Sequence, residues 1–282
     1  MVIKLVMSDH TDRMPIRRIA RRLAESDVEI SGGSIQRILD TVGSGLEAPR
    51  REVEKDIRQA DTLNADETSS RLHNDSVRTR VFLDPETGST AYRIDPSRGR
   101  GVITDLLGEK PGGHVACDGW KPYRICSVQR RWAHLIREVR MISRKNPEDI
   151  ECKMALARLR TIYGDAKRFS GDPTRGRKRH KRMLETRMRR LINRFRDHHI
   201  LGPCMKKLER ALPDSFWFVL DPRIPSTNNA AERALREFVI QNHLRGCLRA
   251  EKSMPRIGNI MTCFTTWKNR GLDPLAEMCQ YV

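Results

Sequence analysis

The most informative stretch of the chain reads Asn228-Asn229-Ala230-Ala231-Glu232-Arg233. Asn228 or Asn229 can begin a helix, because an asparagine side chain accepts hydrogen bonds from the unpaired N–H groups of a first turn. The apolar residues that follow recur at helical spacing and predict one buried face: Ala231, Ala234, Leu235, Phe238 and Val239. Glu232 borders this face. The pattern therefore predicts a carboxylate held at the edge of a core; the alternative is an ordinary surface pair with Arg236 one turn further on.

The composition indicates a polyanionic partner. The chain has 282 residues, and its 54 Lys and Arg outnumber its 36 Asp and Glu, which gives a net charge of +18. Such an excess favours nucleic acid as the partner. A membrane-spanning segment would need about 18 consecutive apolar residues, and the sequence has no such run. We therefore expect a DNA-binding protein that is cytoplasmic and does not associate with membranes.

The seven cysteines are scattered along the chain, and none forms a C-x-x-C pair. An odd number without paired spacing argues against both a disulfide framework and a structural zinc site. We expect reduced thiols.

Residues 14–42 predict a helix-turn-helix. Pro15 suits the first turn of a helix that carries several arginines, and a break follows before Ser34, which can cap a second helix. Gln36 and Arg37 would point outward from this second helix and contact DNA in the major groove. The alternative is an ordinary helical hairpin. Residues 43–60 predict a polar helix or linker.

Residues 60–130 have a strand-rich pattern that leads into helices. Strands are predicted at 77–83 and 90–94, joined by a turn at 84–88, with further strands at 114–117 and 127–130. A short helix is predicted at 97–107 and a longer one within 129–143, the latter with Trp132, Leu135, Ile136 and Val139 inward. The fold class is therefore α/β.

Residues 145–215 predict a basic helical insertion. Between Lys167 and Arg196, 13 Lys and Arg face only Asp172 and Glu185. This density favours a surface that follows phosphates over a merely solvated insertion. The expected DNA contacts are Arg175, Arg177, Lys178 and Arg179. A strand or buried apolar segment is predicted at 216–220, followed by two or three helices, the last capped by Asp273.

Three carboxylates lie at plausible active-site positions. Asp66 lies just before or within the first strand-like region, Asp118 follows the apolar run 115–117, and Glu232 lies near a helix start. Hard oxygen ligands and a basic body suit two Mg²⁺ ions acting on a phosphodiester. Each acid also has an ordinary structural interpretation, such as a turn at Asp118-Gly119.

Five ordered strings then carry a family resemblance: Ala65-Asp66-Glu67-Thr68; Tyr92-Arg93-Ile94-Asp95-Pro96-Ser97-Arg98-Gly99; Asp118-Gly119-Trp120 with Tyr123; Gln129 with Trp132-Ala133-His134-Leu135; and Asn228 to Arg236. Together they resemble transposases of the insertion sequence 66 family. The resemblance covers roughly residues 14–280.

The resemblance implies an RNase H-like mixed sheet flanked by helices and a DDE triad of Asp66, Asp118 and Glu232, which would hold two Mg²⁺ or Mn²⁺ ions. The implied chemistry is cleavage at the ends of an insertion sequence, followed by attack of the freed 3′-hydroxyls on target DNA. Synapsis of two double-stranded DNA ends implies a homodimer or higher oligomer, and the family implies a prokaryotic, nucleoid-associated protein.

Supporting roles follow from the same strings. Trp132 and His134 match a Trp-Ala-His segment, in which His134 would orient a carboxylate, touch a phosphate or simply pack in a helix. Asn228 and Asn229 would shape the Glu232 helix. Arg233 and Arg236 would contact DNA or the surroundings of the triad.

The chain departs from the family pattern at three positions. Asn64 stands where the family usually has His, Ser69 where Gly is common, and Arg131 where a Cys often precedes Trp-Ala-His. Full-length members usually carry an upstream coiled coil and a zinc-binding segment, and from the sequence we expect neither here.

The expected organisation is a helix-turn-helix region and linker at 1–58 and a catalytic domain at 59–282, with the insertion at about 145–215. The rival interpretations are another RNase H-fold nuclease, such as a junction resolvase, and a non-catalytic DNA-binding remnant of a transposase.

Overall fold

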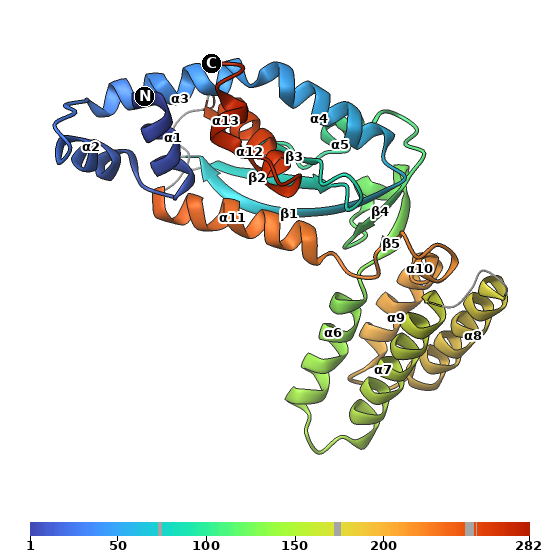
Figure 1. Cartoon of the computed structure of the whole chain (residues 1–282). Helices are drawn as coiled ribbons and strands as arrows, with labels where there is room; N and C mark the ends of the chain where they lie inside the picture. The colour runs from blue at the N-terminus through green and yellow to red at the C-terminus, as the bar shows by residue number, and fades with distance from the viewer. Residues whose placement is uncertain (73–74, 172–175, 246–250, 252) are drawn as a thin grey trace. The chain divides into compact units, whose positions relative to one another are not determined.

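The computed structural model describes residues 1–72, 75–171, 176–245, 251 and 253–282. The chain divides into two compact units (Figure 1). Unit 1 comprises Met1–Pro111 and Asn229–Val282, and unit 2 comprises Gly112–Asn228. Within the described part of the chain, every helix is too short or too polar to cross a membrane.

The fold class is α/β, as predicted. The strands form a mixed five-stranded sheet in the order β3-β2-β1-β4-β5. Strands β1 (Thr62–Leu72), β2 (Asp75–Leu83) and β3 (Thr90–Asp95) pair antiparallel, whereas β4 (His114–Cys117) and β5 (Ser127–Arg130) pair parallel. The four strands predicted from periodicity are confirmed.

Strand β1 was the least visible in the sequence. Its residues are mostly polar and lack the alternation of apolar side chains that marks a half-buried strand. The sequence therefore placed Asp66 only loosely, whereas the structure puts it in the middle of an eleven-residue strand.

Three of the four N-terminal helices of unit 1 lie where the sequence predicted helices, whereas the first helix was not predicted. Helices α1 (Val2–Thr11), α2 (Ile16–Ala24), α3 (Gly32–Gly45) and α4 (Glu47–Gln59) precede the sheet. The cap of α3 is Ser31 and not Ser34, because the Ser31 hydroxyl accepts from the Ser34 N–H at 3.0 Å. The short helix predicted at 97–107 is α5 (Gly101–Leu107).

The N-terminal helices share a core with the C-terminal ones. Helices α11 (Asn229–Arg245), α12 (Ser253–Asn269) and α13 (Pro274–Met278) complete unit 1, and the predicted Asp273 cap of α13 is confirmed. Ile35 and Leu39 of α3 belong to the same buried cluster as Phe264 and Trp267 of α12. The segment carrying the predicted helix-turn-helix is therefore packed into the unit that holds strands β1, β2 and β3.

Helix α12 also covers the outer edge of the sheet. The Thr262 hydroxyl accepts from the Tyr92 N–H, and the Thr266 hydroxyl from the Thr90 N–H, both at 3.0 Å. Because the two threonines lie one turn apart, they match alternate N–H groups of β3. This arrangement satisfies backbone donors that an exposed edge strand would leave open.

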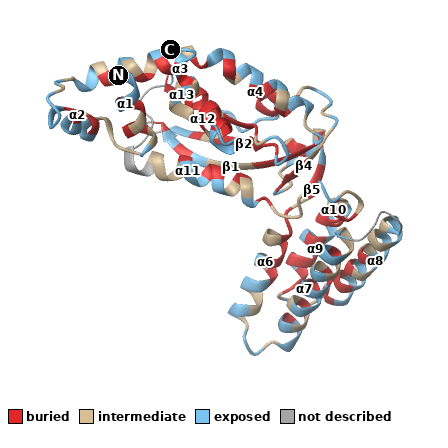
Figure 2. Ribbon diagram, viewed as in Figure 1, coloured by how far each residue is buried: buried red, intermediate tan, exposed pale blue. Residues whose placement is uncertain are grey.

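Unit 2 consists of β4, β5 and a helical body, which is coloured by burial in Figure 2. Helices α6 (Trp132–Lys145), α7 (Ile150–Ser170), α8 (Arg177–Phe195) and α9 (Gly202–Ala211) pack around one apolar cluster. The four residues predicted to face inward from α6 are all buried. The predicted basic insertion is therefore helical.

Of the two alternatives predicted at 216–220, the buried apolar segment is confirmed and the strand is wrong. Residues Trp217–Leu220 form the short helix α10, and Phe216, Phe218 and Val219 are buried. A short apolar run cannot be assigned to strand or helix by periodicity alone, and here its packing against the helical body decided the outcome.

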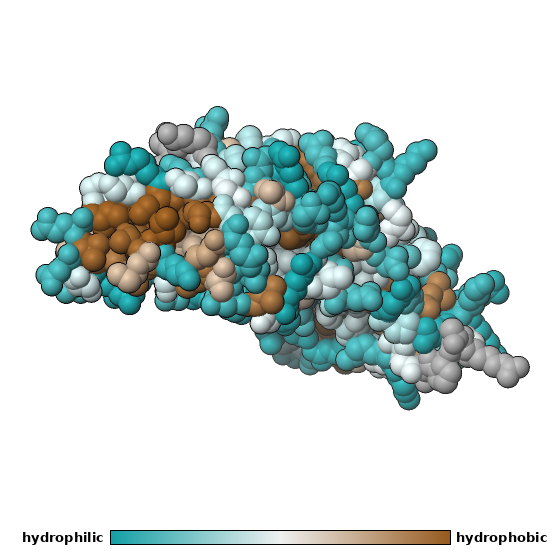
Figure 3. All heavy atoms as spheres, turned by 45° about the horizontal axis from the view of Figure 1, so that its top comes forward, coloured by the Kyte–Doolittle hydropathy of each residue, from teal (hydrophilic) through white to brown (hydrophobic). Residues whose placement is uncertain are grey.

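Unit 1 also carries exposed apolar side chains. Figure 3 shows apolar residues gathered on part of one face of the molecule. The large apolar side chains exposed in α1 include Ile3 and Leu5, at 36% and 40% of their full accessibility. Ile3 and Leu5 lie two residues apart in α1, so they project to different sides of the helix.

Candidate active site

Asp66 points to the face of strands β1, β2 and β3 that α11 covers. In the antiparallel register Asp66 is opposite Val81, which is opposite Tyr92 on β3. Directly opposed residues project to the same face. Val81 and Tyr92 pack against Ala231 and Leu235 of α11 in one buried cluster.

Glu232 lies in the first turn of α11, beside the stripe that contacts this face. The predicted inward residues Ala231, Ala234, Leu235 and Phe238 are buried, and Val239 is half-buried. The Tyr92 hydroxyl donates to the Ala234 carbonyl at 2.9 Å, which fixes α11 against β3. Burial raises the pKa of the Tyr92 phenol, so it remains a donor. Unit 1 thus presents two half-buried carboxylates, Asp66 and Glu232, on one side of its sheet.

Asp118 belongs to unit 2 and follows the last residue of β4. Parallel strands that end together bring their following residues to the same edge, and Cys117 is opposite Arg130. Arg131 and Asp118 therefore meet: the Arg131 Nε donates to the Asp118 Oδ1. His134 Nδ1 lies 3.3 Å from the same oxygen. Asp118 is 43% exposed, so its carboxylate remains accessible.

The turn after Asp118 needs a glycine. Gly119 has a φ of +70°, and a Cβ built there would lie 1.7 Å from the Arg130 guanidinium. A side chain at this position would be strained by the positive φ, and the Arg130 side chain would have to move to make room for it. The backbone of this turn determines where the Asp118 carboxylate projects.

Trp132 anchors the helix that carries His134. Its indole Nε1 donates to the Ser215 carbonyl at 2.6 Å, and its ring stacks on Tyr163 with 5.0 Å between centroids. The side chain is fully buried. Trp132 therefore acts as a packing residue, and the Trp-Ala-His string is explained by a buried anchor followed by a histidine that reaches Asp118.

The expected DNA-contacting residues differ in their surroundings. Arg37, Lys178, Arg179, Arg233 and Arg236 are exposed, whereas Gln36 and Arg177 are half-buried. Arg177 donates to the Leu220 carbonyl at 3.2 Å. Arg175 lies outside the described residues. Asn228 is buried and directly precedes α11, of which Asn229 is the first residue.

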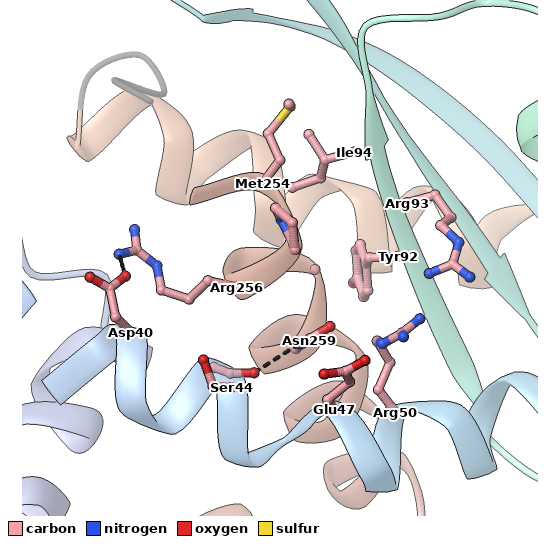
Figure 4. Close-up of a pocket in the computed structure, with 13 residues that line it drawn as sticks. Asp40, Ser44, Glu47, Arg50, Tyr92, Arg93, Ile94, Met254, Arg256 and Asn259 are labelled. Atoms are coloured by element: carbon pink, nitrogen blue, oxygen red, sulfur yellow. Dashed lines mark hydrogen bonds and ion pairs between the residues drawn. The ribbon is translucent and has the colours of Figure 1, made fainter. Parts of the chain in front are cut away.

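A cavity of about 520 Å³ lies in unit 1 between α3, α4, β3 and α12 (Figure 4). Its charged groups already have partners. Arg93 Nη1 lies 2.6 Å from Glu54 Oε1, Arg50 contacts the same carboxylate, and Arg256 pairs with Asp40. The cavity contains none of the predicted catalytic residues, and its ion pairs join the N-terminal helices to β3 and α12.

A mixed donor cluster in unit 2 resembles a metal site at first inspection. Ligand atoms of Asp149, Cys152 and His198 lie within 4.8 Å of one another. His198 Nδ1, however, accepts from the Ile200 and Leu201 N–H groups at 3.2 Å, which leaves the ring proton on Nε2, the atom 3.3 Å from Asp149 Oδ2. Burial also raises the pKa of the Cys152 thiol to about 11. Both facts favour a hydrogen-bonded helix start over coordination.

Comparison with known families decides the assignment. The model of the transposase IS66 family matches residues 1–255. The chain belongs to the IS66 transposase family. No curated protein and no solved structure matches it.

Membership gives this IS66-family chain a transposase function, with the DNA binding and divalent-metal use that the family implies. The carboxylates Asp66, Asp118 and Glu232 suit such a metal by donor chemistry, because Mg²⁺ and Mn²⁺ prefer oxygen ligands. The cluster of Asp149, Cys152 and His198 in unit 2 does not suit such an ion, because it offers a sulfur and a nitrogen donor beside one carboxylate.

What the sequence did not reveal is the environment of Asp118. Arg131 appeared there only as a departure from the family pattern, and Arg130 was not singled out. The two short strands predicted at 114–117 and 127–130 were the available signal. Because β4 and β5 pair in parallel and end together, the residues that follow them, Asp118 and Arg131, lie side by side.

Proposed function

We propose that this IS66-family protein is a DDE transposase with an RNase H-like catalytic fold. It would cleave DNA at the ends of an insertion sequence and join the freed 3′-hydroxyls to target DNA. The observation that carries the proposal is the common face of Asp66 and Glu232 in unit 1, together with Asp118 at the carboxyl end of a parallel strand. The mixed sheet with three leading antiparallel strands supports the fold.

In this proposal the three carboxylates hold the divalent ions. Asp66 on a central strand and Glu232 on an anchored first turn provide two ligands from rigid elements of unit 1. Asp118, which directly follows β4, is the third proposed ligand. When bound, two such ions would activate the attacking oxygen and stabilise the leaving one in an in-line displacement.

The basic surfaces would bind the DNA. Exposed Lys178 and Arg179 begin α8, and Arg233 and Arg236 lie on the same helix as Glu232. Cations that track phosphates position DNA without reading its sequence. Gln36 and Arg37 of α3 would supply base contacts if α2 and α3 act as a helix-turn-helix.

Joining two element ends requires two catalytic centres, so we further propose a homodimer or higher oligomer on DNA. Light scattering with and without element-end DNA would measure the oligomer.

The deciding experiment is a Mg²⁺-dependent assay on DNA that carries the flanking element ends. The wild type is compared with Asp66→Asn, Asp118→Asn and Glu232→Gln. We expect strand transfer in the wild type and none in the three variants, with DNA affinity kept or increased because negative charge near phosphates is removed.

Other outcomes would point elsewhere. Cleavage without strand transfer would favour a structure-specific nuclease. DNA binding without metal-dependent chemistry in any of the proteins would indicate a DNA-binding remnant. Full activity in one variant would remove that residue from the site. Thermal unfolding of each variant must accompany the assay, because Asp118→Asn removes the ion-pair partner of a buried arginine.

A further inference from the structure

The positively charged guanidinium of Arg131 forms an ion pair with Asp118, the carboxylate proposed to bind metal. Its side chain is 3% exposed, and its Nε donates to Asp118 Oδ1. Its Nη2 lies 2.8 Å from His134 Nε2, and His134 Nδ1 lies 3.3 Å from the same Asp118 oxygen. Arg131 and His134 thus converge on one oxygen atom.

The chain around Arg131 restricts how this contact can change. Arg130, immediately before it, is registered against Cys117 in the parallel ladder and packs on Gly119. Trp132, immediately after it, is buried and bonded to Ser215. With both neighbours fixed, the guanidinium can leave Asp118 only by rotation of its own side chain.

We propose that Arg131 is an internal counter-ion that competes with the divalent cation for Asp118 and thereby sets the metal affinity of the site. This inference rests on the proposed function, because it takes Asp118 as a metal ligand. A doubly charged ion approaching Asp118 is repelled by the nearby guanidinium, and the repulsion is strong where water is partly excluded. Displacing Arg131 is also costly, because it breaks an ion pair whose arginine is buried.

The residues involved make the competition asymmetric. Arg131 is 3% exposed, whereas the carboxylate of Asp118 is 43% exposed and can be solvated by water when Arg131 is removed. Neutralising Arg131 should therefore release Asp118 for metal with little damage to the fold. Neutralising Asp118 should remove the ligand itself.

The test is a Mn²⁺ titration of the full chain, in which the paramagnetic resonance signal of free Mn²⁺ reports binding without any catalysis. The neutral variants are Arg131→Gln and Arg131→Met, the second being apolar and of similar length. The matched control is Arg137→Gln, which removes an exposed positive charge from the same helix, α6. Asp118→Asn is measured alone and combined with Arg131→Gln, and thermal unfolding confirms that each protein is folded.

We expect the Arg131 variants to bind Mn²⁺ about fivefold more tightly, the upper range for a partly exposed ion pair. Arg137→Gln should change the Kd less than about twofold, and Asp118→Asn should abolish the gain from Arg131→Gln. Unchanged or weaker binding in either folded Arg131 variant would overturn the competition and leave Asp118 as a ligand. Mn²⁺ affinity that is insensitive to Asp118→Asn in both backgrounds would instead remove Asp118 from the metal site, which is a failure of the proposed function itself.

Discussion

At the scale of single residues, the Asp118 turn combines two demands on the backbone. Gly119 occupies a left-handed conformation, and it also packs directly on the Arg130 guanidinium. Either demand alone would favour glycine. Together they hold the Asp118 carboxylate where β4 and β5 end.

We predict that Gly119→Ala destabilises the protein by more than about 1 kcal/mol, because alanine at positive φ is strained and its Cβ would displace Arg130. Urea unfolding followed by circular dichroism measures the change. Gly112→Ala is the control, since a Cβ there meets open space, and it should stay within about 0.5 kcal/mol. Equal effects in both variants would contradict the packing argument.

At the scale of elements, the attachment of α12 to β3 explains how the C-terminal helices are held on the sheet. Tyr92 makes two of the attachments, because its N–H donates to Thr262 of α12 and its hydroxyl donates to Ala234 of α11. The position of the Glu232 helix therefore depends on β3 as well as on its own apolar stripe.

Thr262→Val should lower the free energy of unfolding by about 1–3 kcal/mol, because it keeps the shape of the side chain but leaves the buried Tyr92 N–H unpaired. Chemical denaturation provides the measurement. Thr161→Val on α7 serves as the control, since Thr161 is exposed and bonds only within its own helix. A loss no larger than that of the control would show that the edge of β3 does not depend on this bond.

The pairing of α7 with α8 includes an ion pair that predicts a pH dependence. The Arg187 guanidinium donates to Asp165 at 2.6 Å, and this bond holds the pKa of the Asp165 carboxyl below its usual range. The folded state therefore favours the ionised carboxylate. Its stabilising contribution is present above a pH of about 4, the pKa of an unfolded Asp, and is lost as the pH falls through the lower folded pKa.

Asp165→Asn should accordingly reduce stability at pH 7 by at most about 1 kcal/mol, because Arg187 is one-third exposed. The difference from the wild type should shrink as the pH is lowered from 5 to 2. Thermal unfolding across this range tests the sign, and a difference that grows in acid would refute the assignment.

At the scale of the whole molecule, the excess of positive charge governs association with DNA. The net charge of +18 includes exposed cations on α8, on α11 and on the arginine-rich helix α2. Neutralising many phosphates releases bound counterions, so affinity depends on salt. This long-range effect does not require any particular contact to be fixed in the free protein.

We predict that the logarithm of the DNA-binding constant falls linearly with the logarithm of the salt concentration, and that Lys178→Gln with Arg179→Gln lowers the magnitude of this slope by about 2. Fluorescence anisotropy with double-stranded DNA measures both. Arg177 is left unchanged because it bonds the Leu220 carbonyl. A matched change of two exposed cations on α7, Lys153→Gln with Arg158→Gln, distinguishes a local surface from total charge. An unaltered slope in the α8 variant would show that the helical insertion is solvated and does not bind DNA phosphates.

The sequence alone determined the features that depend on local pattern and net charge. The apolar spacing after Asn229 predicted the buried face of α11, and the turn at 84–88 predicted the hairpin of β2 and β3. The cap of the last helix and the inward face of α6 were also local. These predictions are correct because each feature depends on residues that are close together in the sequence.

Only the tertiary structure decided the features that join distant segments. The polar strand β1 is buried by its neighbours and not by its own alternation, and the apolar run Trp217–Leu220 became helical through packing. The buried Arg131 against Asp118 depends on a parallel register, and the shared core of α3 with α12 joins the two ends of the chain. Local spacing cannot specify such contacts, because the free energy that fixes them comes from burial against segments far away in the sequence.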